Sequence, residues 1–209
     1  LSSVQAPSLS TDQLAAIDAA DMRSITTAAL RSLSSTQLDG LTSDQLRALS
    51  SSQIAALTTA QVSTLNTDDL NSLASDQFNK LTTGQIQSLT TDQLSHLATD
   101  SLNAFGSTQI AALTTAQVAS LTAGQVAAMT SEDLRALTTA QAAALTAAQV
   151  AALNTAQVSN LDSVDLAAMS TAQWAALTTA QAASLTTAQV ANLTTAQVAA
   201  LETADLVAL

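Results

Sequence analysis

The chain has 209 residues, a formal net charge of −11 at pH 7, no cysteine and only three aromatic side chains. Because nucleic-acid binding needs a basic face that neutralises phosphates, this acidic balance argues against DNA or RNA as a partner. The lack of cysteine excludes disulfides and thiolate metal sites, and no apolar run approaches the roughly 20 residues that span a membrane.

Residues 1–8 form an irregular start, in which Val4, Ala6 and the only proline, Pro7, interrupt the pattern that follows. From residue 9 the chain consists of units of eight residues, called octads here. The positions within an octad are numbered from a large apolar side chain at position 1. An unbroken period of this kind is typical of repeat proteins. We expect residues 1–8 to be a lead-in segment or a degenerate octad, and residues 9–209 to be one continuous array of 25 octads.

Each octad carries the signals of a helix start. Position 2 is Ser, Thr, Asp, Asn or Gly in 22 of the 25 octads, position 5 is Gln in 18, and position 6 is nearly always large and apolar. A hydroxyl followed three residues later by Gln is a capping box, and apolar residues on either side of it form a hydrophobic staple. In residues 113–120, Thr114 is the expected cap, Gln117 closes the box, and Leu113 packs on Val118.

The charges support the same reading. Fifteen of the 16 acids lie at positions 2, 4 or 5, and all five bases lie at positions 7 or 8. Acids in the first turn and bases in the last turn complement a helix dipole, and here the pattern restarts every eight residues. One long helix would smear an eight-residue pattern around its surface, and coiled coils need periods of seven or eleven.

The predicted fold is therefore all-α, a tightly wound solenoid of short capped helices with one helix per eight-residue repeat. Six-residue helices do not survive alone in water, so each must pack on its neighbours. We expect positions 1 and 6 inside, position 4 outside, and small residues at positions 7 and 8 that allow close approach. The number of octads per turn and the handedness stay open.

Position 3 is Ser or Thr in 22 octads, and never Asn, Asp or Gly. A pure capping site would accept those residues, so we expect a different structural role, such as a hydrogen bond to a carbonyl of the preceding octad. An exposed threonine array that orders water or ice is a remote alternative.

Along the chain the octads are varied up to about Phe105 and then converge on LTTAQVAA, as in residues 193–200. Few residues suggest chemistry. The only histidine, His96, is expected to be an exposed polar residue, and Trp174 a core residue. The adjacent acids Asp68 and Asp69, and Glu132 and Asp133, fit dipole compensation, although diffuse cation binding remains an alternative. We therefore predict no catalytic, cofactor-binding or metal-binding residues and no enzymatic activity.

The units LTTAQVAAL, LTTAQVANL and LTAAQVAAL resemble the short Ala/Thr-rich repeats of very large bacterial secreted or surface proteins, often called adhesin-like. The octad also resembles the capped first helix, LTPEQVVAI, of transcription-activator-like effector repeats. The second helix and base-reading loop of those repeats are missing here, so DNA reading is not carried over. The first resemblance implies an extracellular or cell-surface location.

Together these features predict a structural segment of an extracellular bacterial protein: a stalk, a spacer or a filament-forming element. The alternative is an interaction module that binds a protein or a glycan through position 4 and its neighbours. Open solenoid ends predict self-association, or continuation into further repeats.

Overall fold

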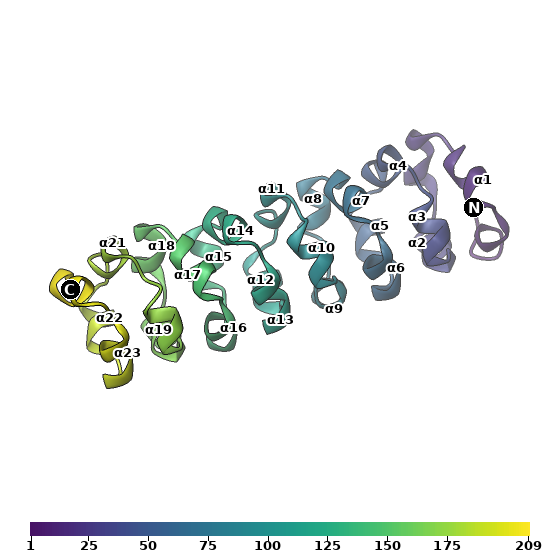
Figure 1. The fold of residues 1–209 in the computed structure, drawn as a ribbon. Coiled ribbons are helices and arrows are strands. Elements are labelled where there is room, and N and C mark those ends of the chain that lie inside the picture. The colour runs from purple at the N-terminus through teal and green to yellow at the C-terminus, as the bar shows by residue number, and fades with distance from the viewer. The chain divides into compact units, whose positions relative to one another are not determined.

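The computed structural model describes residues 1–209, which form short helices and no strands. The chain divides into two compact units, Leu1–Phe105 and Gly106–Leu209, each treated separately here. Figure 1 shows that in both units the chain passes from one short helix to the next without any long element. The all-α solenoid predicted from the sequence is confirmed.

The first unit begins with a single turn and then follows the octads. Its elements are η1 (Ala6–Ser8), α1 (Thr11–Ala15), η2 (Ala19–Ser24), α2 (Thr27–Ser32), α3 (Ser35–Asp39), α4 (Ser43–Ala48), α5 (Ser51–Ala56), α6 (Thr59–Thr64), α7 (Thr67–Ser72), α8 (Ser75–Phe78), α9 (Thr83–Ser88), α10 (Thr91–Ser95) and α11 (Thr99–Leu102). In residues 1–8, Ser2 and Gln5 exchange the two hydrogen bonds of a capping box, and Ala6 is buried.

The second unit has one α-helix in every octad. Its elements are α12 (Ser107–Ala112), α13 (Thr115–Ser120), α14 (Ala123–Ala128), α15 (Ser131–Arg135), α16 (Thr139–Ala144), α17 (Ala147–Ala152), α18 (Thr155–Asn160), α19 (Ser163–Ala168), α20 (Thr171–Trp174), α21 (Thr179–Ala182), α22 (Thr187–Ala191), α23 (Thr195–Ala200) and α24 (Thr203–Ala208).

Every α-helix begins at position 3, and the capping box explains why. In the octad of α13, the Thr114 hydroxyl accepts from the Gln117 N–H at 3.2 Å, and the Gln117 side-chain oxygen accepts from the Thr114 N–H at 2.7 Å. Most helices repeat this exchange. Asp18 and Asp162 occupy the same cap position, but their side chains make no capping bond.

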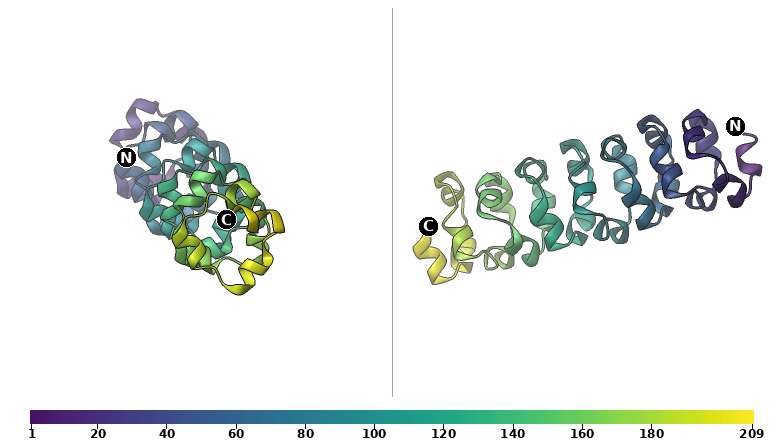
Figure 2. Two further views of the ribbon diagram at one scale, coloured as in Figure 1. Left: turned by 90° about the vertical axis from the view of Figure 1, so that its left-hand side faces the viewer. Right: turned by 90° about the horizontal axis from the view of Figure 1, so that it is seen from above.

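Within each unit, most helices pack mainly on the helix three octads away. The pairs include α3 with α6 and α4 with α7 in the first unit, and α13 with α16 and α16 with α19 in the second. The views in Figure 2 show these successive turns side by side within a unit. Small residues at positions 7 and 8 are expected to permit this close approach.

The burial pattern agrees with the predicted inside and outside of the solenoid. The position-6 side chains are almost completely buried from Leu14 to Ala182, and the position-1 side chains are buried or half-buried from residue 9 to residue 201. Position 4 is exposed in all 25 octads. The predicted assignment of these three positions is therefore confirmed.

The prediction for position 3 was wrong in its detail. None of these hydroxyls donates to a carbonyl of the preceding octad. Three of them bond to a carboxylate about three octads later: Ser43 to Asp69, Ser51 to Asp76 and Thr139 to Asp165. Position 3 is the first helical residue, which places its side chain at the surface facing the next turn rather than the previous octad.

Candidate functional site

The most regular polar feature of both units is a ladder of glutamine side chains at position 5. Each of these glutamines except Gln13, in the first octad, is buried, although it sits at the start of a helix near the surface. Its side-chain oxygen accepts from the cap N–H of its own octad, as the capping box requires. Its Nε2 is then free to donate elsewhere, and it reaches into the previous turn of the solenoid.

Most of these Nε2 atoms donate to two carbonyl groups of the previous turn. In the second unit, Gln149 donates to the Leu121 carbonyl at 2.7 Å and to the Val118 carbonyl at 2.9 Å, which lie 28 and 31 residues earlier. The same pair of bonds recurs for Gln45, Gln53, Gln61, Gln77, Gln85 and Gln93 in the first unit and for Gln141, Gln157, Gln173, Gln181, Gln189 and Gln197 in the second.

These bonds agree with the helix contacts on the number of octads in one turn. The carbonyl 28 residues earlier belongs to position 1 of the octad three before the donor, and helices contact those three octads away, so a turn takes about three octads. The carbonyls that accept belong to position 6, in the last turn of a helix, and to position 1, its C-cap residue. The position-6 carbonyl also accepts from the backbone N–H of that C-cap residue. The ladder therefore adds a donor to two of the carbonyls at the C-terminus of a short helix.

The sequence contained a signal for this ladder that capping alone does not explain. Glutamate closes a capping box as well as glutamine does, yet position 5 is never glutamate in 25 octads. A carboxylate has no N–H to donate. Asp occurs there in five octads, so the signal for a site that uses both an acceptor and a donor is the predominance of Gln over carboxylates.

Asp69 is the clearest exception to the ladder. Its buried carboxylate accepts from the Asn66 amide at 2.6 Å and from the Ser43 hydroxyl at 3.2 Å. Burial raises the pKa of Asp69, the nearby charges of Asp39 and Asp68 add to this, and the two hydrogen bonds oppose it. The carboxylate cannot provide the two donor bonds that a glutamine would supply at this place.

A second set of inter-turn bonds comes from position 7 in the first unit. Arg23 donates to the Ala48 carbonyl at 3.1 Å, Arg47 to the Ser72 carbonyl at 3.0 Å, and Asn71 to the His96 carbonyl at 3.0 Å. Each acceptor lies at the C-terminus of the helix three octads later. The two arginines thus compensate the dipole of a neighbouring helix as well as that of their own.

The residues singled out in the sequence do not converge on one place. His96 is exposed and its ring contacts only Asp92 and Ser95 of its own octad. Trp174 is buried and donates its ring N–H to the Leu166 carbonyl at 3.2 Å, as expected for a core residue. No group of three or more His, Cys, Asp or Glu side chains is placed to hold a metal ion.

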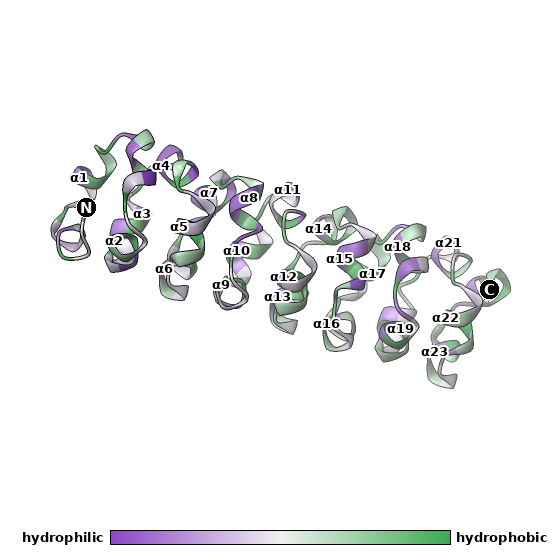
Figure 3. Ribbon diagram, turned by 180° about the vertical axis from the view of Figure 1, so that it is seen from behind, coloured by the Kyte–Doolittle hydropathy of each residue, from purple (hydrophilic) through white to green (hydrophobic).

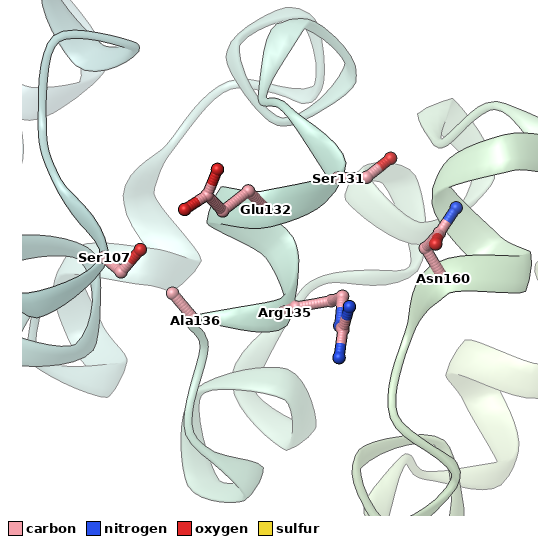
Figure 4. Close-up of a pocket in the computed structure, with 6 residues that line it drawn as sticks. All are labelled: Ser107, Ser131, Glu132, Arg135, Ala136 and Asn160. Carbon is pink, nitrogen blue, oxygen red and sulfur yellow. The ribbon is translucent and has the colours of Figure 1, made fainter.

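One recess interrupts the otherwise uniform surface of the second unit. It is an open cavity of about 520 Å³ over α12, α15 and α18, lined by Ser107, Ser131, Glu132, Arg135, Ala136 and Asn160. Figure 4 shows Ser107 and Glu132 on one side of α15, and Arg135 and Asn160 on the other. The corresponding positions one octad later are Thr115, Thr139, Ala140, Ala143, Ala144 and Ala168.

The recess has the chemistry of a contact surface. The Glu132 carboxylate and the Arg135 guanidinium form no ion pair with each other or with any other group. Figure 3 shows hydrophilic colouring concentrated in the first unit and returning at α15 in the second. The lining therefore presents two hydroxyls, one amide and two opposite charges.

The arrangement of octads agrees with the comparisons to known proteins. The model of the ALTTAQ repeat matches residues 14–50, 43–67, 95–131, 126–163 and 158–195. A search among curated proteins found no match. None of the short helices has the length and apolar character of a membrane-spanning segment. Since the matched segments cover most of the chain and lie in both units, this protein belongs to the ALTTAQ repeat family.

Proposed function

We propose that this repeat array is a spacer or stalk that sets the distance between other parts of an extracellular bacterial protein. The observation that carries the proposal is the glutamine ladder. Most octads provide the same donors to the turn before them and the same acceptors to the turn after them. An added octad therefore lengthens the array without requiring any new kind of contact.

The extracellular location is part of this proposal. It is supported by the resemblance of the octads to repeats of large bacterial surface proteins and by the absence of cysteine, which suits a secreted chain. Protease treatment of intact producing cells tests it. Cleavage of the array without lysis is the expected result, and complete protection until lysis would contradict a surface location.

The spacer role is tested by varying the number of octads. Copies of residues 193–200 are inserted in the uniform region, and the maximum dimension is measured by small-angle X-ray scattering. We expect the dimension to increase by the same amount for each inserted octad, with helicity per residue unchanged in circular dichroism. A dimension that does not grow with the number of octads would contradict a spacer.

Self-association or continuation into further repeats is a finer part of the proposal. The position-6 side chains of Val198 and Leu206 are 37% and 41% exposed, whereas earlier ones are buried by octads that follow them. Further repeats, or the first turn of another copy, would cover them. Light scattering of the chain at rising concentration tests association, and a strict monomer would favour covalent continuation alone.

The recess around Arg135 supports a second candidate function, the binding of a partner protein. Five polar or charged side chains gather at a place where the next octad offers mostly alanine and threonine. Unpaired charges of both signs suit a peptide that carries neighbouring basic and acidic side chains.

A displayed library of short peptides tests this second function. The wild-type chain should enrich peptides of mixed charge, and Glu132→Ala with Arg135→Ala should abolish the enrichment. Asp162→Ala, which removes a charge from the octad after α18, is the matched control and should retain it. Equal enrichment by the wild type and the double variant would exclude the recess as the binding site.

A further inference from the structure

All described hydrogen bonds between turns of the solenoid join residues that are close in the sequence. In each unit the longest of them spans 31 residues, and helices contact mainly those three octads away. No octad is held by a distant part of the chain. Whether one octad stays folded therefore depends only on a few neighbouring octads, as in other quasi-one-dimensional repeat proteins.

The geometry of the ladder determines how the array responds to tension. When a chain of this kind is pulled by its termini, the outermost octad is opposed by two apolar side chains and at most one glutamine. At the N-terminal end this glutamine is Gln37, and at the C-terminal end Asp205 stands at position 5. The bonds of the remaining octads join other pairs of solenoid turns. Those octads therefore do not resist the pulling force until they become the outermost ones. Bonds that are broken one after another resist less force than bonds that are broken together.

We propose that the array is an extensible element, which lengthens under tension by releasing octads one or a few at a time and shortens again by refolding. This inference rests on the proposed spacer function and adds to it a response to force. Eight residues in extended conformation span up to about 26–29 Å. A released octad therefore provides a large gain in length for the loss of few bonds.

Stretches of the array differ in a way that this inference uses. The donors from Gln173 to Gln197 recur in four consecutive octads, so release at a nearly constant force is expected there. Other residues replace glutamine at position 5 in both units: Asp21, Ala29, Asp69 and Ser101 in the first, and Asp133, Asp165 and Asp205 in the second. Octads beside these residues are held by fewer bonds and should be released at lower force.

The test is a pulling and relaxation cycle in an optical trap, with handles on both termini of the 209-residue chain. The expected trace is a series of small steps that together form a plateau, retraced on relaxation. A single event that releases a whole unit at once would overturn the proposal. It would leave the spacer function standing, because the scattering test is made without force.

Two sets of variants identify the ladder as the source of the plateau. Gln141→Glu, Gln149→Glu and Gln157→Glu keep the acceptor of the capping box but lose the donor. The control set, Ala140→Glu, Ala148→Glu and Ala156→Glu, adds the same charge at the adjacent exposed position 4. We expect octads to be released at lower force in the first set only.

Circular dichroism shows beforehand whether each set is folded, and Gln149→Glu alone serves if the triple variant is not. If the ladder variants and the control variants extend at the same force, the ladder does not set the resistance and the inference is wrong.

Discussion

At the residue scale, one side chain type accounts for much of the order in this protein. A glutamine at position 5 accepts from its own cap and donates to the turn before it, so the same residue starts a helix and joins two turns. A buried carbonyl left without a donor costs about 1–3 kcal/mol, which is why the amide is needed here.

Replacing Gln149 by glutamate separates these two roles. The cap is retained, but two hydrogen bonds are lost and a carboxylate is buried against carbonyl oxygens. We expect the free energy of unfolding to fall by about 2–4 kcal/mol in a urea titration. Ala148→Glu, with the same charge one residue earlier on the surface, should change it by less than about 0.5 kcal/mol.

Asp69 makes the stability of the array depend on pH. Because its pKa is raised above the ordinary 3.8, the folded state holds this proton more tightly than the unfolded state does. The contribution of Asp69 is therefore most favourable below about pH 3.8 and declines as the pH rises through the folded value.

Asp69→Gln removes this dependence and supplies donors for the carbonyls of Leu38 and Leu41. We expect a gain of about 1–2 kcal/mol at pH 7 and a smaller gain near pH 4, measured by urea unfolding at both values. Asp68→Asn, at the exposed neighbouring position, is the control. A gain of the same size at both pH values would show that the buried charge is not the cause.

At the scale of the element, adjacent threonines have different roles. The Thr114 hydroxyl caps α13, whereas Thr115 is exposed and makes no hydrogen bond with its side chain. Thr114→Ala should lower stability by about 1 kcal/mol, and Thr114→Asn should restore most of it, as Asn154 caps α18. Thr115→Ala should have little effect in the same thermal melts. Equal losses at the two positions would contradict the assignment of the cap.

Much of the helix pattern follows from local chemistry, and for that reason it could be read from the sequence. Caps, boxes and dipole charges act within one octad, so positions 2, 5 and 6 predicted where each helix begins and which side is buried. The number of octads per turn could not be predicted, because it depends on contacts between residues far apart in the sequence. One example is the hydrogen bond from the Gln149 Nε2 to a carbonyl 28 residues earlier. The recess at Arg135 was missed for the same reason: Ser107, Glu132 and Asn160 meet only because turns stack.

At the scale of the whole molecule, stability is expected to be a sum over octads and their junctions. No octad is stable alone, since a six-residue helix is too short to form in water. The eight-residue period is therefore the property on which the glutamine ladder and the apolar core both depend. It places each glutamine opposite two carbonyls and each apolar side chain inside.

Two deletions at one site test this register most directly. Removing residues 145–152 takes out one whole octad and lets every later glutamine meet equivalent carbonyls in the turn before it. Removing residues 145–148 instead brings Gln149 to a buried position 1 and misplaces the ladder bonds that cross the site. Thermal melting followed by circular dichroism should show a small loss of stability for the first deletion and a much larger loss for the second. Indistinguishable melting curves for the two deletions would contradict the octad as the structural unit of this protein.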